Sequence, residues 1–137
     1  MRSPCLILVL LAASTAPFVA ACADRLPDQD RRITETRPTA KLSVDYLWKD
    51  YQTDRAAADR KYWGKAVDIS GKVTSVETTA PRRVMFELQA PLGVEARLLD
   101  DHADEILASV TVGERATLRC FCAGLSGNVV LTSCIRP

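Results

Sequence analysis

Hydrophobic side chains after Ser43 recur every three or four positions, which is the spacing of one face of an α-helix. We therefore predict a helical segment over 43–62, with Ser43 or Asp45 capping its start. Its apolar stripe consists of Leu47, Tyr51, Ala58 and Tyr62. A polar run over 52–54 could divide the segment into two short helices, and Gly64 ends it.

Beyond Gly64 the hydrophobic positions alternate, which is typical of strands with one buried face. We expect strands over 66–78, 83–90, 94–99, 115–122 and 128–135. A short helix over 100–110 separates the third strand from the fourth, with Asp100 or Asp101 as its cap. The glycine-containing run 124–127 predicts the turn between the last two strands.

Five strands with a helix between the third and fourth follow the element order of an OB-fold, a small Greek-key β-barrel. The fold class predicted is therefore mainly β: a five-stranded OB-fold barrel preceded by an N-terminal helix. Gly71 supports this, because the long first strand must bend and an interior glycine often marks such a bend. An unrelated five-stranded barrel or sandwich is the alternative.

The first residues have the pattern of an export signal. Arg2 precedes an eight-residue apolar run over 6–13, which is shorter than the roughly 20 residues that span a membrane. Small residues then lead to Val19-Ala20-Ala21-Cys22, which looks like a bacterial lipobox. We predict a signal peptide over 1–21 and a lipid on Cys22; ordinary secretory cleavage after Ala23 is the alternative.

Two or three acyl chains on Cys22 would give stable membrane anchoring. Ala23, rather than Asp, follows the cysteine, and this resembles lipoproteins sorted to the outer membrane of enteric-type bacteria. The predicted location is the cell envelope, on the periplasmic face of the outer membrane. Residues 22–38 are polar and are predicted to form a flexible tether, followed by one domain over 39–137.

Two blocks of residues carry a family resemblance. The first consists of Tyr51, Asp54, Ala58, Asp59, Tyr62, Gly64 and Lys65, followed by Val67, Ile69, Gly71 and Val73. The second consists of Val112, Gly113, Glu114, Thr117, Leu118, Cys122, Gly124, Val129, Val130, Leu131 and Cys134. Together they resemble the tRNA-anti-like family of secreted or lipidated bacterial OB-fold proteins, over about 45–135. The chain departs from the family pattern near Asp54, where Asn is usual, and at Cys120, where Gly is usual.

The chain has five cysteines, of which Cys5 leaves with the signal and Cys22 carries lipid. An oxidising compartment predicts one disulfide among the remaining three. The family resemblance implies Cys122–Cys134. Hairpin geometry leaves Cys120–Cys134 open as the competing pair, while a bulge would favour Cys122. The third thiol is expected to be a small buried hydrophobe.

Charge and aromatic content weigh against a nucleic-acid ligand. The chain has 18 basic and 17 acidic residues, and the domain over 39–137 has 13 of each. The ligand face of an OB-fold would carry Arg83, Met85, Glu87, Glu95 and Arg97, and Phe86 points inward. This face lacks the basic groove and stacking aromatics of single-strand binding. Arg82, Arg83 and Arg97 are the weak candidates for ligand contact.

Enzyme chemistry finds no support in the sequence. One histidine, His102, lies on a predicted capping turn, and phosphate-binding glycine motifs are missing from the sequence. Cys120-x-Cys122 does not have zinc-ligand spacing, so we predict no metal, no cofactor and no catalytic residue. The predicted role is a non-catalytic binding or interaction module whose partners are the membrane and an envelope protein. Binding of an envelope oligosaccharide or small polyanion is the alternative.

Overall fold

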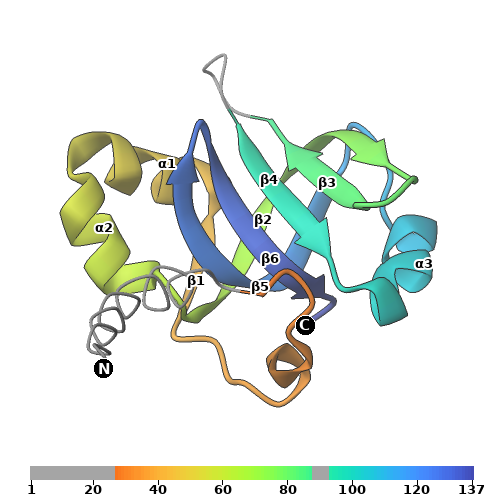
Figure 1. Ribbon diagram of the computed structural model, residues 1–137. Helices are drawn as coiled ribbons and strands as arrows, with labels where there is room; N and C mark the ends of the chain where they lie inside the picture. The colour runs from red at the N-terminus through yellow and green to blue at the C-terminus, as the bar shows by residue number, and fades with distance from the viewer. Residues whose placement is uncertain (1–26, 88–92) are drawn as a thin grey trace, which may run out of the picture.

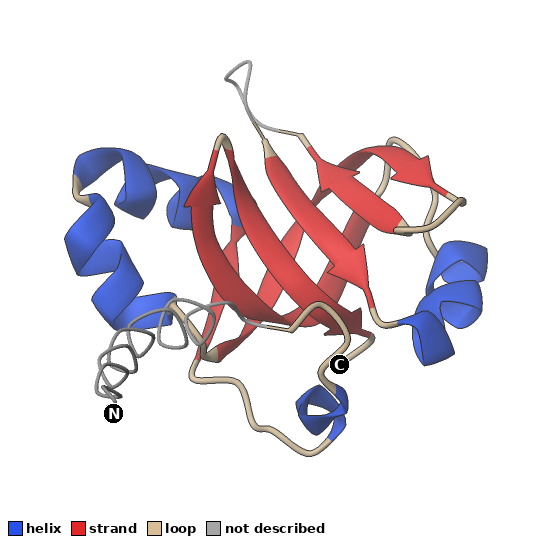
Figure 2. Cartoon of the chain, in the orientation of Figure 1, coloured by secondary structure: helices blue, strands red, loops and turns tan. Residues whose placement is uncertain are grey.

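The computed structural model describes residues 27–87 and 93–137, and their strands close into an OB-fold barrel (Figures 1 and 2). The barrel strands are β2 (Ala66–Glu77), β3 (Arg83–Phe86), β4 (Val94–Leu98), β5 (Arg115–Ser126) and β6 (Asn128–Ile135). They pair in the order β2–β3–β4–β6–β5, and β5 closes the barrel on β2. The pair β4–β6 is parallel and the other pairs are antiparallel. The predicted fold class is confirmed.

Strand β2 serves both sides of the barrel because it changes partners along its length. Its first part, Ala66–Lys72, pairs with β5, and Val73–Glu77 pairs with β3. Gly71 lies at this change, beneath the start of the first helix. A Cβ atom on Gly71 would lie 2.6 Å from one methyl of Val44 and 3.0 Å from the ring of Phe86. The glycine is needed for this close approach as well as for the bend.

Two helices cover one end of the barrel: α1 (Val44–Thr53) and α2 (Arg55–Tyr62). The side chain of Ser43 accepts a hydrogen bond from the Tyr46 amide and caps α1. Asp54 has extended backbone angles and caps α2 through the Ala57 amide, which separates the two helices where the polar run predicted. The predicted apolar stripe of Leu47, Tyr51, Ala58 and Tyr62 is buried in the core.

A short strand, β1 (Ala40–Ser43), was not predicted from the sequence. It pairs in parallel with Val67–Ser70 of β2 and adds a sixth strand to the sheet. Its four residues are too few to show a clear alternation, and its pairing depends on a strand distant in sequence. Strand β5 also continues to Ser126, beyond the predicted end at residue 122, so the turn is confined to Gly127.

Residues 27–38 form a strap bound to the barrel, which corrects the expectation of a flexible tether over this part of 22–38. The strap contains a single turn of 3-10 helix, η4 (Arg31–Thr34), and Ile33 is fully buried. Ile33 packs in a second apolar cluster outside the barrel core; its other members are Ala66, Leu99, Phe121 and Ile135. The polar composition of the segment gave no indication of this contact, because the contact depends on a single apolar side chain, that of Ile33.

Helix α3 (Asp100–Ser109) lies between β4 and β5, as predicted, but neither Asp100 nor Asp101 caps it. Leu99 occupies the N-cap position and makes no side-chain capping bond. Instead, the side-chain oxygen of Gln29 in the strap accepts a hydrogen bond from the Asp100 amide at 2.8 Å. The Gln29 side-chain nitrogen donates to the Leu98 carbonyl. The helix start is thus satisfied by a residue 71 positions away.

Candidate functional site

The face expected to bind ligand is formed by β3 and β4. Arg83 lies opposite Arg97 across the two strands, and Met85 lies opposite Glu95. One carboxylate oxygen of Glu95 accepts hydrogen bonds from Arg83 Nη1 and Arg97 Nε, each at 2.9 Å. Glu95 points outward as predicted, yet it is buried beneath these two guanidinium groups.

Each of the two arginines also contacts a second carboxylate. Arg83 Nη2 donates to Glu77 Oε2 of β2 at 3.3 Å, and Arg97 Nη1 donates to Asp28 Oδ1 of the strap at 3.3 Å. Their guanidinium groups are partly exposed at the edge of this network. Two positive charges therefore face three negative ones, and the face has no excess positive charge.

The side chain of Arg82 contacts α3 and does not join the network around Glu95. Its Nη1 atom donates to Asp104 Oδ1 of α3 at 2.6 Å, and its Nη2 atom donates to the Asp100 carbonyl at 3.4 Å. The structure therefore brings together only Arg83 and Arg97 of the three candidate arginines. Arg82 ties the turn before β3 to the first turns of α3.

The ionisation of Glu95 is set by two opposing effects. Burial disfavours the charged carboxylate, but the hydrogen bonds and positive charges of Arg97 and Arg83 outweigh burial. The net result is a pKa of Glu95 below its usual range. Glu95 is therefore ionised at neutral pH, and its carboxylate is the hydrogen-bond acceptor that Arg83 and Arg97 share.

No aromatic side chain among the described barrel strands is available for stacking. Phe86 is in the core, as alternation predicted, and Phe121 is buried under the strap. The exposed aromatic residues of the described parts are Tyr46 on α1 and Trp63 after α2. The side chain of Trp63 is 41% exposed.

The disulfide joins Cys120 of β5 to Cys134 of β6, with Cα atoms 4.2 Å apart. Cys122 has a free, buried thiol. The pairing implied by the family resemblance, Cys122–Cys134, is therefore not the one formed, and the competing pair Cys120–Cys134 is present. The expectation that the third thiol is a small buried group is confirmed.

A bulge in β6 explains this pairing, which corrects the expectation that a bulge would favour Cys122. The paired residues on either side of it are Arg119 with Ile135 and Phe121 with Thr132. Between these pairs β5 has one residue, Cys120, whereas β6 has Ser133 and Cys134. Ser133 has a φ of 55°, in the left-handed region. The extra residue brings Cys134 beside Cys120 and leaves Cys122 opposite Leu131.

The free thiol lies in a polar contact within the core. Cys122 Sγ lies 3.4 Å from the hydroxyl of Tyr51, which donates a hydrogen bond to Asp59 Oδ1 at 3.0 Å. Burial raises the pKa of the Cys122 thiol and also that of the Tyr51 hydroxyl. Both groups are thus protonated at neutral pH, which suits a structural contact and not a nucleophile.

Ala58, Asp59, Tyr62 and Gly64, which belong to the first block of the family resemblance, join the two helices to each other and to β5. Ala58 is buried against the core, and Asp59 holds Tyr51. Tyr62 donates to Asp50 Oδ2, and Gly64 donates its amide to the Cys122 carbonyl at 2.8 Å. The motif that carries the resemblance therefore has a structural role.

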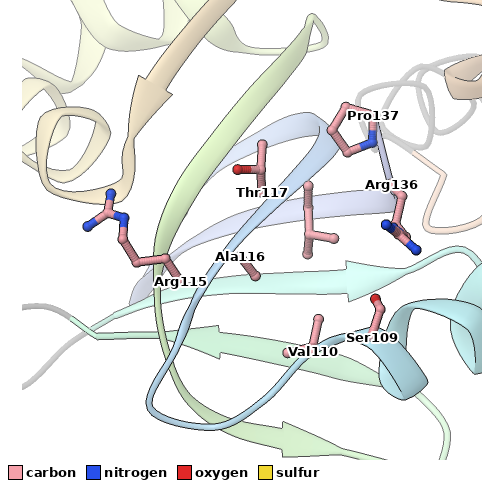
Figure 3. A pocket seen from close by; sticks show the side chains of 8 residues that line it. Ser109, Val110, Arg115, Ala116, Thr117, Arg136 and Pro137 are labelled. Atoms are coloured by element: carbon pink, nitrogen blue, oxygen red, sulfur yellow. The ribbon is translucent and has the colours of Figure 1, made fainter.

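A groove of about 300 Å³ lies between the end of α3 and the start of β5 (Figure 3). Ser109, Val110, Arg115, Thr117 and Arg136 are among its lining residues. Arg115 and Arg136 lie at opposite sides of the view and do not converge on one point. Arg136 Nη1 also lies 3.6 Å from Glu105 Oε1, with which it forms an ion pair. Sequence reasoning did not identify this groove, because it forms only when α3 packs beside the barrel.

Within residues 27–87 and 93–137, no group of three or more His, Cys, Asp or Glu side chains is placed to hold a metal ion. None of the helices in these ranges has the length and apolar character to cross a bilayer. The predicted lipidation residue, Cys22, and the signal peptide lie outside the described residues.

The barrel order and the parallel β4–β6 pair define an OB-fold protein. The family model tRNA_anti-like matches residues 1–135, so the chain belongs to the tRNA_anti-like family. A similar solved structure is described as a "putative nucleic acid-binding lipoprotein" from Klebsiella pneumoniae. It is 15% identical, with a TM-score of 0.56, over 77% of this chain and 94% of the other. No curated protein matches the chain.

Proposed function

We propose that the chain is a lipoprotein of the bacterial envelope, anchored through Cys22 on the periplasmic face of the outer membrane. Three observations support this location. The lipobox places a cysteine after small residues, and the similar Klebsiella protein is described as a lipoprotein. The Cys120–Cys134 disulfide suits an oxidising compartment outside the cytoplasm.

We propose further that the barrel acts as a non-catalytic module that binds an envelope protein through the β3–β4 face. The observation that carries this proposal is the charge network centred on Glu95, in which Arg83 and Arg97 already face carboxylates. A surface with fixed charges of both signs around Met85 is suited to a protein partner of complementary charge pattern. Neither the family description nor the description of the Klebsiella protein names an enzyme.

The same network argues against nucleic acid and against the polyanion alternative. A phosphate or an anionic sugar would have to displace Glu95, Glu77 or Asp28 before it could bind these arginines. No exposed aromatic residue on the described barrel strands compensates with stacking energy. We therefore do not propose for this chain the nucleic-acid binding that the description of the Klebsiella protein names.

The test is affinity purification of the tagged full-length chain from gently solubilised envelopes. Met85→Glu places a new negative charge at the centre of the proposed face. Val112→Glu is the matched control, since Val112 is an exposed apolar residue on the loop after α3. We expect a stoichiometric protein partner with the wild type and with Val112→Glu, and its loss with Met85→Glu. Retention of a glycan without a protein would instead support the oligosaccharide alternative.

A further inference from the structure

The strap fixes where the lipid anchor leaves the barrel. Ser133 Oγ accepts a hydrogen bond from the Asp30 amide at 2.7 Å and donates to the Pro27 carbonyl at 3.4 Å. Next to these contacts, Asp28 pairs with Arg97. The chain is thus bound to β6 and β4 from its first described residue onward.

Further contacts hold the next residues of the strap at the same end of the barrel. The Gln29 side chain bonds both the Leu98 carbonyl and the Asp100 amide, and Arg31 pairs with Asp101 at 2.7 Å. We call this region the attachment end; it consists of η4, the first turn of α3 and the β6 segment at Ser133. In Figure 1 the strap passes beneath the barrel at this end, beside the chain terminus marked C.

The distance from the proposed lipid to this end is short. Cys22 and Pro27 are five positions apart, so even a fully extended chain spans at most about 18 Å. A domain of this size has a radius of gyration of about 13 Å, which for a compact sphere corresponds to a diameter of about 34 Å. This diameter is roughly twice the reach of the connection. A flexible tether over the whole predicted range 22–38 would have allowed the barrel to turn any face to the bilayer, and this short connection does not.

We propose that the attachment end faces the lipid headgroups of the bilayer that holds Cys22, and that the β5–β6 turn points away from it. This inference rests on the proposed lipid anchor. Gly127 in that turn is six residues along β6 from Ser133, a separation of about 20 Å. The turn and the adjoining Gly93 therefore form the end of the barrel farthest from the membrane.

The headgroup contact follows from the short connection and does not need an anionic surface. Exposed arginines at the attachment end already face carboxylates: Arg31 faces Asp101, and Arg32 faces Asp30. With no excess positive charge in these pairs, electrostatic attraction to acidic lipids is not the cause of the orientation. The orientation is expected in bilayers made only of zwitterionic lipid.

The experiment uses the full-length chain, expressed with its own signal, isotope-labelled and extracted from bacterial membranes. It is reconstituted in phosphatidylcholine nanodiscs that contain a gadolinium-chelating lipid, and amide relaxation is measured by NMR. We expect several-fold stronger relaxation enhancement at Ile33 and Asp101 than at Gly127. Equal enhancement at the three amides would overturn the inference.

A spacer variant is the matched control. Twenty Gly/Ser residues inserted between Leu26 and Pro27 leave the fold intact but give a flexible connection with a root-mean-square span of about 28 Å. The relaxation difference between Ile33 and Gly127 should then largely disappear; an unchanged difference would also overturn the inference. A chain that is missing from membranes, or whose Cys22→Ala variant is equally membrane-bound, contradicts the proposed anchor, whereas a bound chain with no gradient contradicts only the orientation.

Discussion

Ser133 Oγ accepts a hydrogen bond from the backbone amide of Asp30 at 2.7 Å, and this bond joins the strap to the bulge of β6. The bulge that turns this serine toward the strap also places Cys134 beside Cys120. One local irregularity of β6 therefore determines both the disulfide pairing and the site where the N-terminal segment attaches.

Ser133→Ala should destabilise the fold and loosen the strap. It leaves the buried Asp30 amide without its acceptor, which costs about 1–3 kcal/mol of unfolding free energy. Trypsin should cleave after Arg31 and Arg32 faster than in the wild type, because η4 opens more often. Ser126→Ala, at an exposed position, is the control and should change neither the unfolding free energy nor the cleavage rate. An Ser133→Ala protein with unchanged cleavage would show that this bond does not hold the strap.

The disulfide connectivity can be determined by peptide mapping. Trypsin does not cleave before Pro137, so it leaves the three cysteines of the barrel in one peptide, residues 120–137. Chymotryptic cleavage after Phe121 is therefore needed to separate Cys120 from Cys122. Alkylation of the denatured, unreduced protein should label Cys122 and yield a Cys120–Cys134 linked pair. A linked Cys122–Cys134 pair would contradict the structure.

Stability measurements should give the same assignment. Cys120→Ser should lower the unfolding free energy by about 3 kcal/mol, because the bond closes a loop with a sequence separation of 14. Cys122→Ala should retain the bond and cost less. The assignment is wrong if Cys122→Ala, and not Cys120→Ser, abolishes the disulfide.

Gly71→Ala should destabilise the barrel by about 1–3 kcal/mol through overpacking against Val44. Val44→Ala in the same chain removes the clashing methyl groups, so the double variant should be more stable than the sum of the two single losses predicts. Gly93→Ala is the control, since the nearest atom to its new Cβ is 3.5 Å away. Chemical denaturation of the wild type and the four variants gives these free energies, and simple additivity of the Gly71→Ala and Val44→Ala losses would reject the proposed clash.

Glu95→Gln should change the acid dependence of stability. The pKa of Glu95 in the folded protein lies below its ordinary value of 4.5, so its charge stabilises the fold above pH 4.5. This contribution is lost as pH falls below 4.5 through the lower, folded pKa. The difference in unfolding free energy between wild type and Glu95→Gln should therefore be largest near neutral pH and shrink in acid.

Urea titrations at several pH values test this dependence. Glu87→Gln is the matched control, since Glu87 makes an exposed ion pair with Lys72 that contributes little. A wild-type advantage over Glu95→Gln that stays constant down to pH 3 would mean that the network does not depend on the Glu95 charge.

The sequence was sufficient to predict features that depend on local patterns. Alternation predicted the five barrel strands, and Asp54 marked the division of the helical segment because a short acidic side chain caps the second helix. Gly71 indicated the bend in β2. These features follow from neighbouring residues, and the barrel order follows from their succession.

The features that sequence reasoning missed depend on contacts between distant residues. The strap relies on a single buried isoleucine, Ile33, and the α3 cap is supplied by Gln29. The bulge at Ser133 has a positive φ without a glycine, so nothing in the sequence indicated it. The family resemblance implied Cys122–Cys134, and hairpin geometry left the observed pair, Cys120–Cys134, only as the alternative.

The candidate site was predicted only in part, for the same reason. Alternation placed Arg83 and Arg97 on one face, as the structure has them. The carboxylate of Asp28 comes from the strap, and that of Asp104 from α3, so the neutralisation of the arginines became visible only in the fold.

The proposal on which the function and the orientation both rest is that Cys22 carries lipid and thereby holds the barrel at a membrane. Metabolic labelling with an alkyne analogue of palmitate, in bacteria expressing the full-length chain or its Cys22→Ala variant, tests it most directly. We expect a labelled wild-type band and no label on Cys22→Ala. An unlabelled wild type, or equal labelling of both chains, would contradict it.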